Sequence, residues 1–301
     1  MLDPHRSRRS FLSGCTSILA SIGLFSSVPA QAKTTNISLV GKKLPAWSPG
    51  TLDIHHIATG SGNAAFFILP DATSMLVDAG AIYDRDRFAI APRPSAARRP
   101  GEWIGRYVRR HLRPTGRKDL DYFLLSHLHR DHMGESVPGL PRSRHGDYAL
   151  TGVADVAELV RTRRFIDRAF PSYDYPAPLA GASNDNYIAF IRAQQRMGAT
   201  VERFSAGSNS QIHLVNQPSK YPSFEVRNLY ANGDLWTGEG DGTRHIFPES
   251  AQPKPGKPID QLPTENECSV AIRLRYGQFS YFTGGDLSNN CLLYTSPSPR
   301  D

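Results

Sequence analysis

The sequence has little cysteine, no long hydrophobic run and no internal repeat. Only three of its 301 residues are cysteines, and two of them, Cys15 and Cys291, lie in terminal segments that we expect to be separate from the folded domain. A domain whose only cysteine is Cys268 forms no internal disulfide, so its hydrophobic core must hold it together. The apolar stretch at residues 18–25 contains serine and glycine and is too short to span a membrane.

Composition and charge exclude several other classes of protein. Hydrophobic residues make up 39% of the chain and charged residues 21%, which is typical of globular proteins and argues against a disordered or collagen-like chain. The formal net charge of +7 is compatible with an anionic substrate.

The N-terminus has the features of an export signal. Arg8 and Arg9 precede the apolar stretch, and residues 30–32 (Ala-Gln-Ala) match the pattern that signal peptidases cleave. Residues 7–12 resemble the twin-arginine signal. We therefore predict a signal peptide at residues 1–32, recognition by the twin-arginine export machinery, and a periplasmic or secreted mature protein without a membrane span. A general secretory signal is the alternative.

The C-terminus does not resemble a natural protein segment. Residues 291–301 resemble one reading frame of a transposase-derived sequencing adapter. We predict that these eleven residues are not native and that the folded domain covers residues 33–290. A natural proline-rich tail is the alternative.

Short apolar runs bounded by glycine, proline and aspartate predict a layered α/β fold. The expected strands are residues 52–54, 64–70, 74–80, 120–125 and 224–230, with a hairpin of residues 268–274 and 279–283. Apolar spacing predicts helices at residues 103–112, 153–170 and 186–197. The five prolines of residues 248–263 predict a loop.

The candidate chemistry lies after the strand at residues 120–125, in the sequence Ser-His-Leu-His-Arg-Asp-His of residues 126–132. On an extended chain His127, His129 and Asp131 project to one side. His132 joins them if the chain bends near Asp131. Nitrogen and oxygen donors without cysteine suit zinc, manganese or iron.

This His-x-His-x-Asp-His motif resembles the signature of the metallo-β-lactamase superfamily. Asp78, in the sequence Val-Asp-Ala-Gly of residues 77–80, resembles the aspartate that supports the metal ligands there. Asp286, in residues 283–287, resembles the aspartate that bridges both metals. The resemblance implies an αββα sandwich, here truncated at its C-terminus.

Within the superfamily, the pattern is closest to the extracytoplasmic hydrolase domain of ComEC-like DNA-uptake proteins. The residues that carry this resemblance are 52–54, 60–64, 120–121 and 266–270. This chain lacks the membrane channel of those proteins, so it would be a free-standing relative.

The resemblance also implies roles for the site residues. His127 and His129 would hold the first of two divalent ions and Asp131 and His132 the second, with Asp286 between the two ions. Zinc is the metal expected first, with manganese or iron as alternatives. Metals in such a site lower the pKa of a bound water to about 7 and supply hydroxide for attack. Asp131 would orient or deprotonate that water.

Two ligands of the superfamily pattern are not identified. One is a further histidine for the first metal, for which His145, His213 and His245 are candidates, each also explained as a loop histidine. The other is a histidine expected after Asp286. We therefore expect weak binding of the second metal and weak or no activity from the chain as written.

The sequence predicts a metal-dependent hydrolase but does not determine its substrate. A phosphodiester, either a small molecule or nucleic acid, is favoured by the net charge and by Arg93, Arg98 and Arg99 near the expected mouth of the site. The alternatives are a lactam, lactone or thioester hydrolase with the same metal centre, and a non-catalytic metal-stabilised binding protein.

Overall fold

The computed structural model describes residues 41–83 and 93–287. The chain divides into two units, residues 1–44 and 45–301, and every helix and strand of the described residues belongs to the second unit. The predicted signal peptide at residues 1–32 and the predicted tail at residues 291–301 lie outside the described residues.

The first of two sheets has six strands in sequential order, β1 to β6. The pairs β1–β2 and β2–β3 are antiparallel, whereas β3, β4, β5 and β6 run parallel to one another. Their bounds are β1 Asp53–His56, β2 Ala65–Ile68, β3 Ser74–Val77, β4 Leu120–Leu124, β5 Thr162–Asp167 and β6 Thr200–Arg203. The parallel strands therefore end at one common edge of the sheet.

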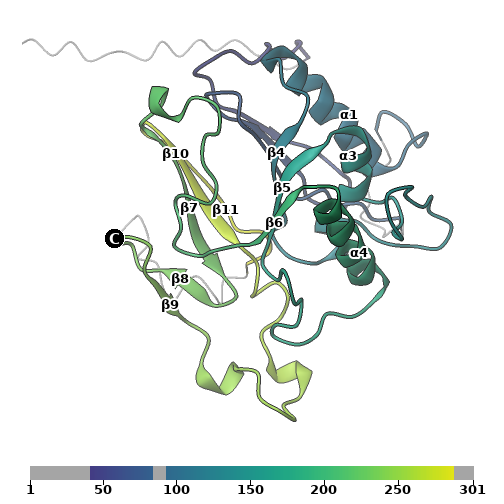
Figure 1. Cartoon of the computed structure of the whole chain (residues 1–301), viewed down its shortest axis with the longest axis vertical. Coiled ribbons are helices and arrows are strands. Elements are labelled where there is room, and N and C mark those ends of the chain that lie inside the picture. The colour runs from purple at the N-terminus through teal and green to yellow at the C-terminus, as the bar shows by residue number, and fades with distance from the viewer. Residues whose placement is uncertain (1–40, 84–92, 288–301) are drawn as a thin grey trace, which may run out of the picture. The chain divides into compact units, whose positions relative to one another are not determined.

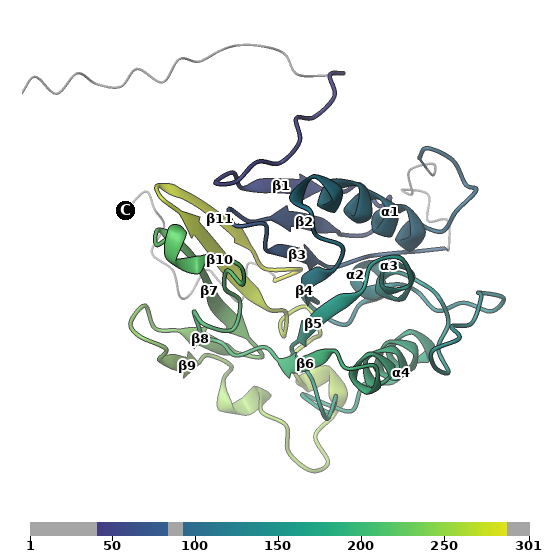
Figure 2. The same cartoon turned by 45° about the horizontal axis from the view of Figure 1, so that its top comes forward.

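Side chains on both faces of this sheet are buried, in two separate cores. Phe66 and Phe123 pack with the helices, whereas their chain neighbours Phe67 and Leu124 pack on the opposite face, as the two-residue period of a strand requires. Helices α1 (Pro100–Leu112), α3 (Val153–Leu159) and α4 (Ala182–Arg196) cover the first face (Figure 2). Burial on both faces explains the nearly continuous apolar runs of β2 to β4.

The second sheet packs against the other face of the first. Its strands are antiparallel, in the order β11-β10-β7-β8-β9. Val226, Ile272 and Leu274 belong to the buried core that the two sheets share, and Figure 1 shows β7, β10 and β11 beside the first sheet. The bounds are β7 Phe224–Ala231, β8 Asp234–Trp236, β9 Thr243–His245, β10 Ala271–Tyr276 and β11 Phe279–Thr283.

The described residues therefore form three layers, one of helices and two of sheets. This agrees with the predicted α/β class and with three layers of an αββα sandwich. Within the described ranges, α1, α3 and α4 all belong to the helical layer on the first sheet. The fourth layer and the C-terminal truncation stay predictions. None of the described helices has the length and apolar character needed to cross a bilayer.

One expected element is wrong. Residues 153–170 do not form a single helix, because α3 ends at Leu159 and β5 follows at Thr162–Asp167. Phe165 packs with the helices and Ile166 with the second sheet. A central parallel strand buries adjacent apolar residues in this way, and its pattern is hard to tell from a buried helix by periodicity alone.

Candidate metal centre

The candidate site lies where two neighbouring parallel strands end. Asp78 directly follows β3, and its backbone N–H donates to the carbonyl of Leu124, the last residue of β4 (3.0 Å). The histidine motif begins at His127, three residues after the end of β4 at Leu124. The carboxyl edge of a parallel sheet is a common place for ligand sites, and here the register of β3 with β4 brings Asp78 next to the motif.

The motif bends earlier than an extended chain would allow. The one-turn helix α2 (Arg130–Met133) begins directly after His129, and the N–H groups of His132 and Met133 donate to the His129 carbonyl (both 3.0 Å). The extended arrangement expected through Asp131 is therefore wrong beyond His129. The predicted bend exists, and it returns His132 toward His127, with ring centroids 4.1 Å apart.

The motif packs directly on the backbone around Gly80. A Cβ atom on Gly80 would lie 1.8 Å from the carbonyl oxygen of Asp131. That carbonyl accepts a hydrogen bond from the N–H of Asn63 (2.9 Å), and the N–H of Ala79 donates to the carbonyl of His132 (2.7 Å). Only glycine permits this approach, which explains the glycine two residues after Asp78.

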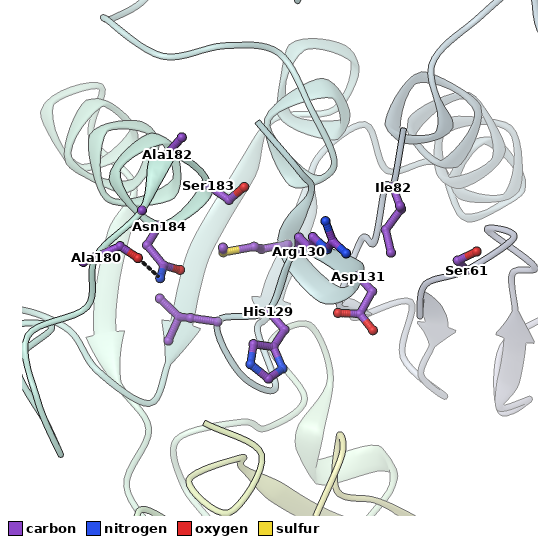
Figure 3. Close-up of a pocket in the computed structure, with 12 residues that line it drawn as sticks. Ser61, Ile82, His129, Arg130, Asp131, Ala180, Ala182, Ser183 and Asn184 are labelled. Atoms are coloured by element: carbon purple, nitrogen blue, oxygen red, sulfur yellow. Dashed lines mark hydrogen bonds between the residues drawn. The ribbon is translucent and has the colours of Figure 1, made fainter. Parts of the chain in front are cut away.

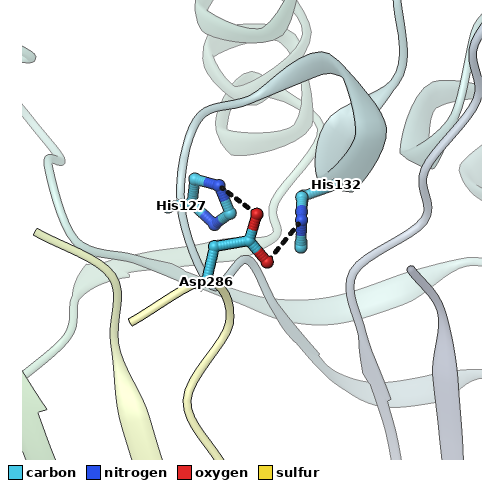
Figure 4. A group of neighbouring side chains, drawn as sticks. All are labelled: His127, His132 and Asp286. Atoms are coloured by element: carbon cyan, nitrogen blue, oxygen red, sulfur yellow. Dashed lines mark ion pairs between the residues drawn. The ribbon is translucent and has the colours of Figure 1, made fainter. Parts of the chain in front are cut away.

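Three side chains form the centre of the site. One ligand atom each from His127, His132 and Asp286 lies within 4.8 Å of the other two (Figure 4). The Asp286 carboxylate lies between the two imidazoles, 3.9 Å from Nε2 of His127 and 3.3 Å from Nε2 of His132. His127 and His132 are buried, whereas Asp286 is exposed.

His129 and Asp131 each approach one of the central histidines. Nδ1 of His129 lies 3.0 Å from Nε2 of His127, and Oδ2 of Asp131 lies 3.8 Å from Nε2 of His132. The structure thus brings three of the five predicted ligands into one cluster and places His129 and Asp131 each beside one of its histidines. The pairs His127 with His129 and His132 with Asp131 are those that the resemblance assigned to separate metals.

Asp78 supports the site from behind. Its buried carboxylate lies 2.8 Å from Nδ1 of His132 and accepts hydrogen bonds from the N–H (2.7 Å) and hydroxyl (2.8 Å) of Ser126. The Asn63 amide also donates to it (2.9 Å). A carboxylate on the far nitrogen of an imidazole fixes its tautomer and leaves Nε2 available to a metal. Sequence reasoning gave no role to Ser126 or Asn63, although Ser126 directly precedes the motif.

The two central histidines differ in protonation. Burial, reinforced by the nearby imidazoles of His132 and His129, lowers the pKa of His127 to about 2, so its lone pair is available at neutral pH. Burial also opposes a charge on His132, but the hydrogen bond and charge of Asp78, with Asp286 and Asp131, outweigh it and raise the pKa of His132 to about 8. The carboxylates of Asp78, Asp286 and Asp131 therefore favour a positive charge at His132 even without a metal.

The donor set fits a divalent transition metal. Ligand atoms around a tetrahedral ion with bonds near 2.0–2.1 Å lie about 3.3 Å apart, and the shortest contacts here, 3.0 and 3.3 Å, are close to that spacing. Imidazole and carboxylate donors suit zinc, manganese or iron. Small side-chain rotations would bring the 3.8 and 3.9 Å contacts into range.

A cavity of about 810 Å³ opens beside these ligands. His129, Arg130 and Asp131 line its middle, the first turn of α4 lies on one side, and Ser61 and Ile82 lie on the other (Figure 3). Catalytic metal sites keep a position open to substrate, whereas structural ones are closed by protein ligands. This site is of the open kind.

The three candidates for the further histidine ligand do not join the cluster in the described part of the chain. Nε2 of His145 accepts from Arg144 (3.3 Å), Nδ1 of His213 lies 2.7 Å from the Ser210 carbonyl, and Nδ1 of His245 lies 2.7 Å from Asp234. His145 and His213 therefore have partners close by in the sequence, and His245, on β9, pairs with Asp234 on the neighbouring strand β8.

The three arginines expected near the mouth do not line the cavity either. Arg99 pairs with Asp155 (2.6 Å), and Arg98 lies over the Trp103 ring (5.7 Å). Arg93 is exposed. The cation that does line the cavity is Arg130, which pairs with Glu135 (2.6 Å).

Comparison with known proteins does not identify a family. No protein-family model matches the sequence, and no curated protein matches it. Among solved structures, the chain is similar to CmlA, a diiron beta-hydroxylase from Streptomyces venezuelae, and to a point mutant of that enzyme, each with a TM-score of 0.36 and 14% identity. The match covers 78% of this chain and 29% or 30% of the hydroxylase chains, so this chain spans less than a third of their length.

Proposed function

We propose that this protein is a metal-dependent hydrolase of the metallo-β-lactamase superfamily, with phosphodiesters as its substrate class. The observation that carries the proposal is the convergence of His127, His132 and Asp286 within 4.8 Å, with Asp78 hydrogen-bonded behind His132. These residues come from three separate segments of the chain, and packing alone gives no reason for them to meet.

The distances support a division of the ligands into two pairs. His127 and His129 would hold one divalent ion, Asp131 and His132 the other, with Asp286 facing both. Zinc fits this donor set, as do manganese and iron. When bound, such ions lower the pKa of a coordinated water and neutralise charge that develops on the attacked centre.

The chain's own residues would prepare the rest of the reaction. Asp78 holds the orientation of the His132 ring through its 2.8 Å contact with Nδ1. Asp131 lines the cavity with a side chain that is 34% exposed, so its carboxylate can orient a water or accept its proton. The cavity places a substrate directly beside His129 and Asp131.

The cavity favours a substrate with an anionic group. Arg130 lines it, although Glu135 offsets part of that charge. Opposite, α4 begins at Ala182 after the N-cap residue Gly181, which makes no side-chain cap hydrogen bond, and helix N-termini favour phosphate-like groups. Lactams, lactones and thioesters remain alternatives that the experiment separates.

The test uses the full chain loaded with Zn²⁺ or Mn²⁺ and three substrates: an activated phosphodiester, a chromogenic β-lactam and a lactone. We expect phosphodiester cleavage that is abolished in His129→Ala. The control variant His145→Ala, which changes a histidine outside the metal-binding motif, should cleave the phosphodiester as the wild type does. Turnover of the lactam alone would overturn the phosphodiester assignment. No turnover at full metal occupancy would instead support a non-catalytic metal-binding protein.

We propose further that the protein acts after export by the twin-arginine machinery. The support is Arg8 and Arg9 before an apolar stretch. Replacing both arginines with lysine should retain a fused reporter inside the cell. Unchanged export of that variant would favour the general secretory route.

A further inference from the structure

Arg168 is a fully buried arginine at the carboxyl end of β5. Its side chain has 0% exposure, and the residue directly follows the last residue of the strand. Its Nε donates to Oε1 of Glu265 (2.7 Å) and its Nη2 donates to Oε2, so the pair is bidentate. Its Nη1 donates to the Tyr175 carbonyl (2.9 Å) and to Oδ1 of Asn232 (3.1 Å). A buried charge needs such a complete set of partners.

The Glu265 carboxylate also accepts a hydrogen bond from the segment that carries the candidate metal ligands. Its Oε1 accepts a hydrogen bond from the backbone N–H of Leu128 (2.7 Å). Leu128 lies between His127 and His129, in the segment between the end of β4 and the start of α2. That segment is tied to the same part of the chain a second time, because the N–H of Val270 donates to the Ser126 carbonyl (2.8 Å).

We propose that Arg168 and Glu265 are positioning residues for the metal centre, which fix the backbone at Leu128 and so set the spacing of His127 and His129. The inference rests on the proposed metal site. Arg168 holds the Glu265 carboxylate in one orientation, and the carboxylate holds the Leu128 amide. The imidazoles on either side of Leu128 are then held with their nitrogens 3.0 Å apart.

The arrangement predicts which ligands depend on the pair. His127 and His129 flank the Leu128 amide, whereas His132 is held by Asp78 and by the helical turn α2. Loosening the Leu128 contact should therefore weaken the ion held by His127 and His129 more than the one held by Asp131 and His132.

Strand β4, which precedes the Leu128 segment, supplies a matched control near its N-terminal end. Asp121, in β4, accepts from Arg117 (3.1 Å) and from the backbone N–H of Ser74 (3.0 Å), and its side chain is 3% exposed. Asp121 therefore resembles Glu265 in binding one arginine and one backbone amide, but that amide lies in β3 and not in the metal-binding loop.

The experiment compares Glu265→Ala, Glu265→Gln and Asp121→Asn in the full chain. Zn²⁺ affinity is measured by competition with a chromogenic chelator, the ligand field by Co²⁺ absorption, and stability by thermal unfolding of the metal-free proteins. We expect Glu265→Ala to lower Zn²⁺ affinity by about 10–100-fold, as loss of an outer-shell partner does, and to alter the Co²⁺ spectrum. Glu265→Gln should lose less, because its amide oxygen still accepts from Leu128.

Asp121→Asn should lower the unfolding temperature but leave Zn²⁺ affinity and the Co²⁺ spectrum unchanged. Equal affinities for Glu265→Ala and wild type, or an equal loss in Glu265→Gln and Glu265→Ala, would overturn the positioning role. If Glu265→Ala does not fold, Glu265→Gln decides alone: a reduced Zn²⁺ affinity supports the role, and wild-type affinity overturns it. A wild-type chain that binds no metal would overturn the proposed function as well, which distinguishes the two failures.

Discussion

Among the described residues, two groups of neighbouring histidines can be compared, and one of them forms a candidate metal site. We call His127, His129 and His132 the motif histidines, and His55 and His111 the edge histidines. The rings are equally close in both groups: the centroids of His127 and His129 are 4.7 Å apart, and so are those of His55 and His111. Proximity of imidazoles alone therefore does not distinguish the two groups.

The difference lies in the carboxylates and in what fixes the rings. Asp286 lies between two of the motif histidines, His127 and His132, and Asp78 lies behind His132. At the edge, Nδ1 of His55 is 2.9 Å from the Tyr107 hydroxyl, and Asp53 is 3.9 Å from Nε2. Among the described residues, the edge group provides no set of three donors within 4.8 Å. The two groups therefore differ in their carboxylates, because only at the motif histidines do aspartates from separate segments of the described chain approach the same imidazole rings.

The largest expected difference is in metal affinity when a histidine is removed. His132→Ala deletes a donor, so we expect Zn²⁺ affinity to fall by more than about a hundredfold, beyond the loss usual for outer-shell partners. His111→Ala should leave the affinity unchanged. Chelator competition on both variants measures this, and equal losses would contradict the distinction between the groups.

Much of the fold and of the candidate site could be predicted from sequence. The short apolar runs predicted β2, β3 and β4, helical spacing predicted α1, and the histidine motif with Asp78 and Asp286 predicted the residues that meet. These features are local patterns, or patterns matched to a known signature. The strands β6, β8 and β9 were not predicted, because short, partly exposed strands carry little periodicity.

The supports of the site could not be predicted in this way. Arg168 and Glu265 are 97 positions apart, and an arginine or a glutamate on its own predicts a solvated surface residue. Only the fold shows that their charges are buried together. A bend near Asp131 was expected, but its helical form was not, because Arg130–Met133 make one helical turn whose hydrogen bonds begin at the His129 carbonyl, and so short a turn has no apolar repeat.

A smaller expected difference concerns the carboxylates beside each group. Asp78→Asn removes the charge behind His132 while keeping the size of the side chain, so we expect Zn²⁺ affinity to fall by about 10–100-fold. Asp53→Asn, beside His55, is the matched control and should bind Zn²⁺ as tightly as wild type. If calorimetric titration finds both variants equal to wild type, Asp78 only caps the turn before Gly80.

His132 and the edge histidines should titrate in opposite directions in the metal-free protein. Asp78, Asp286 and Asp131 outweigh burial and raise the pKa of His132 to about 8, whereas burial lowers the pKa of His55 and of His111 below the ordinary 6.5. The proton on His132 therefore stabilises the fold below pH 6.5, and this stability is lost as pH rises through 8. For the edge histidines the neutral form is favoured, so their contribution is present above pH 6.5 and is lost as pH falls.

NMR titration of the imidazole nitrogens after chelator treatment measures these values directly. In Asp78→Asn the His132 midpoint should move down toward 6.5 or below, because burial then acts with less opposition, while the edge midpoints stay in place. A His132 midpoint at or below that of His55 in the wild-type protein would show that the carboxylates do not stabilise a cation at the site.

The smallest expected effect is at the edge group itself. Tyr107→Phe removes the hydroxyl that lies 2.9 Å from Nδ1 of His55, so we expect the free energy of unfolding to fall by about 1 kcal/mol, the net value of one hydrogen bond. Tyr281→Phe is the control, since its hydroxyl lies 3.4 Å from Nε2 of the exposed His56 and should contribute less. Denaturant unfolding measures both. Because the Tyr107 hydroxyl and ring contact His55 and His111, which we assign to packing, loss of the hydroxyl should leave Zn²⁺ affinity unchanged, and a lower affinity in Tyr107→Phe would show that the edge group belongs to the metal site after all.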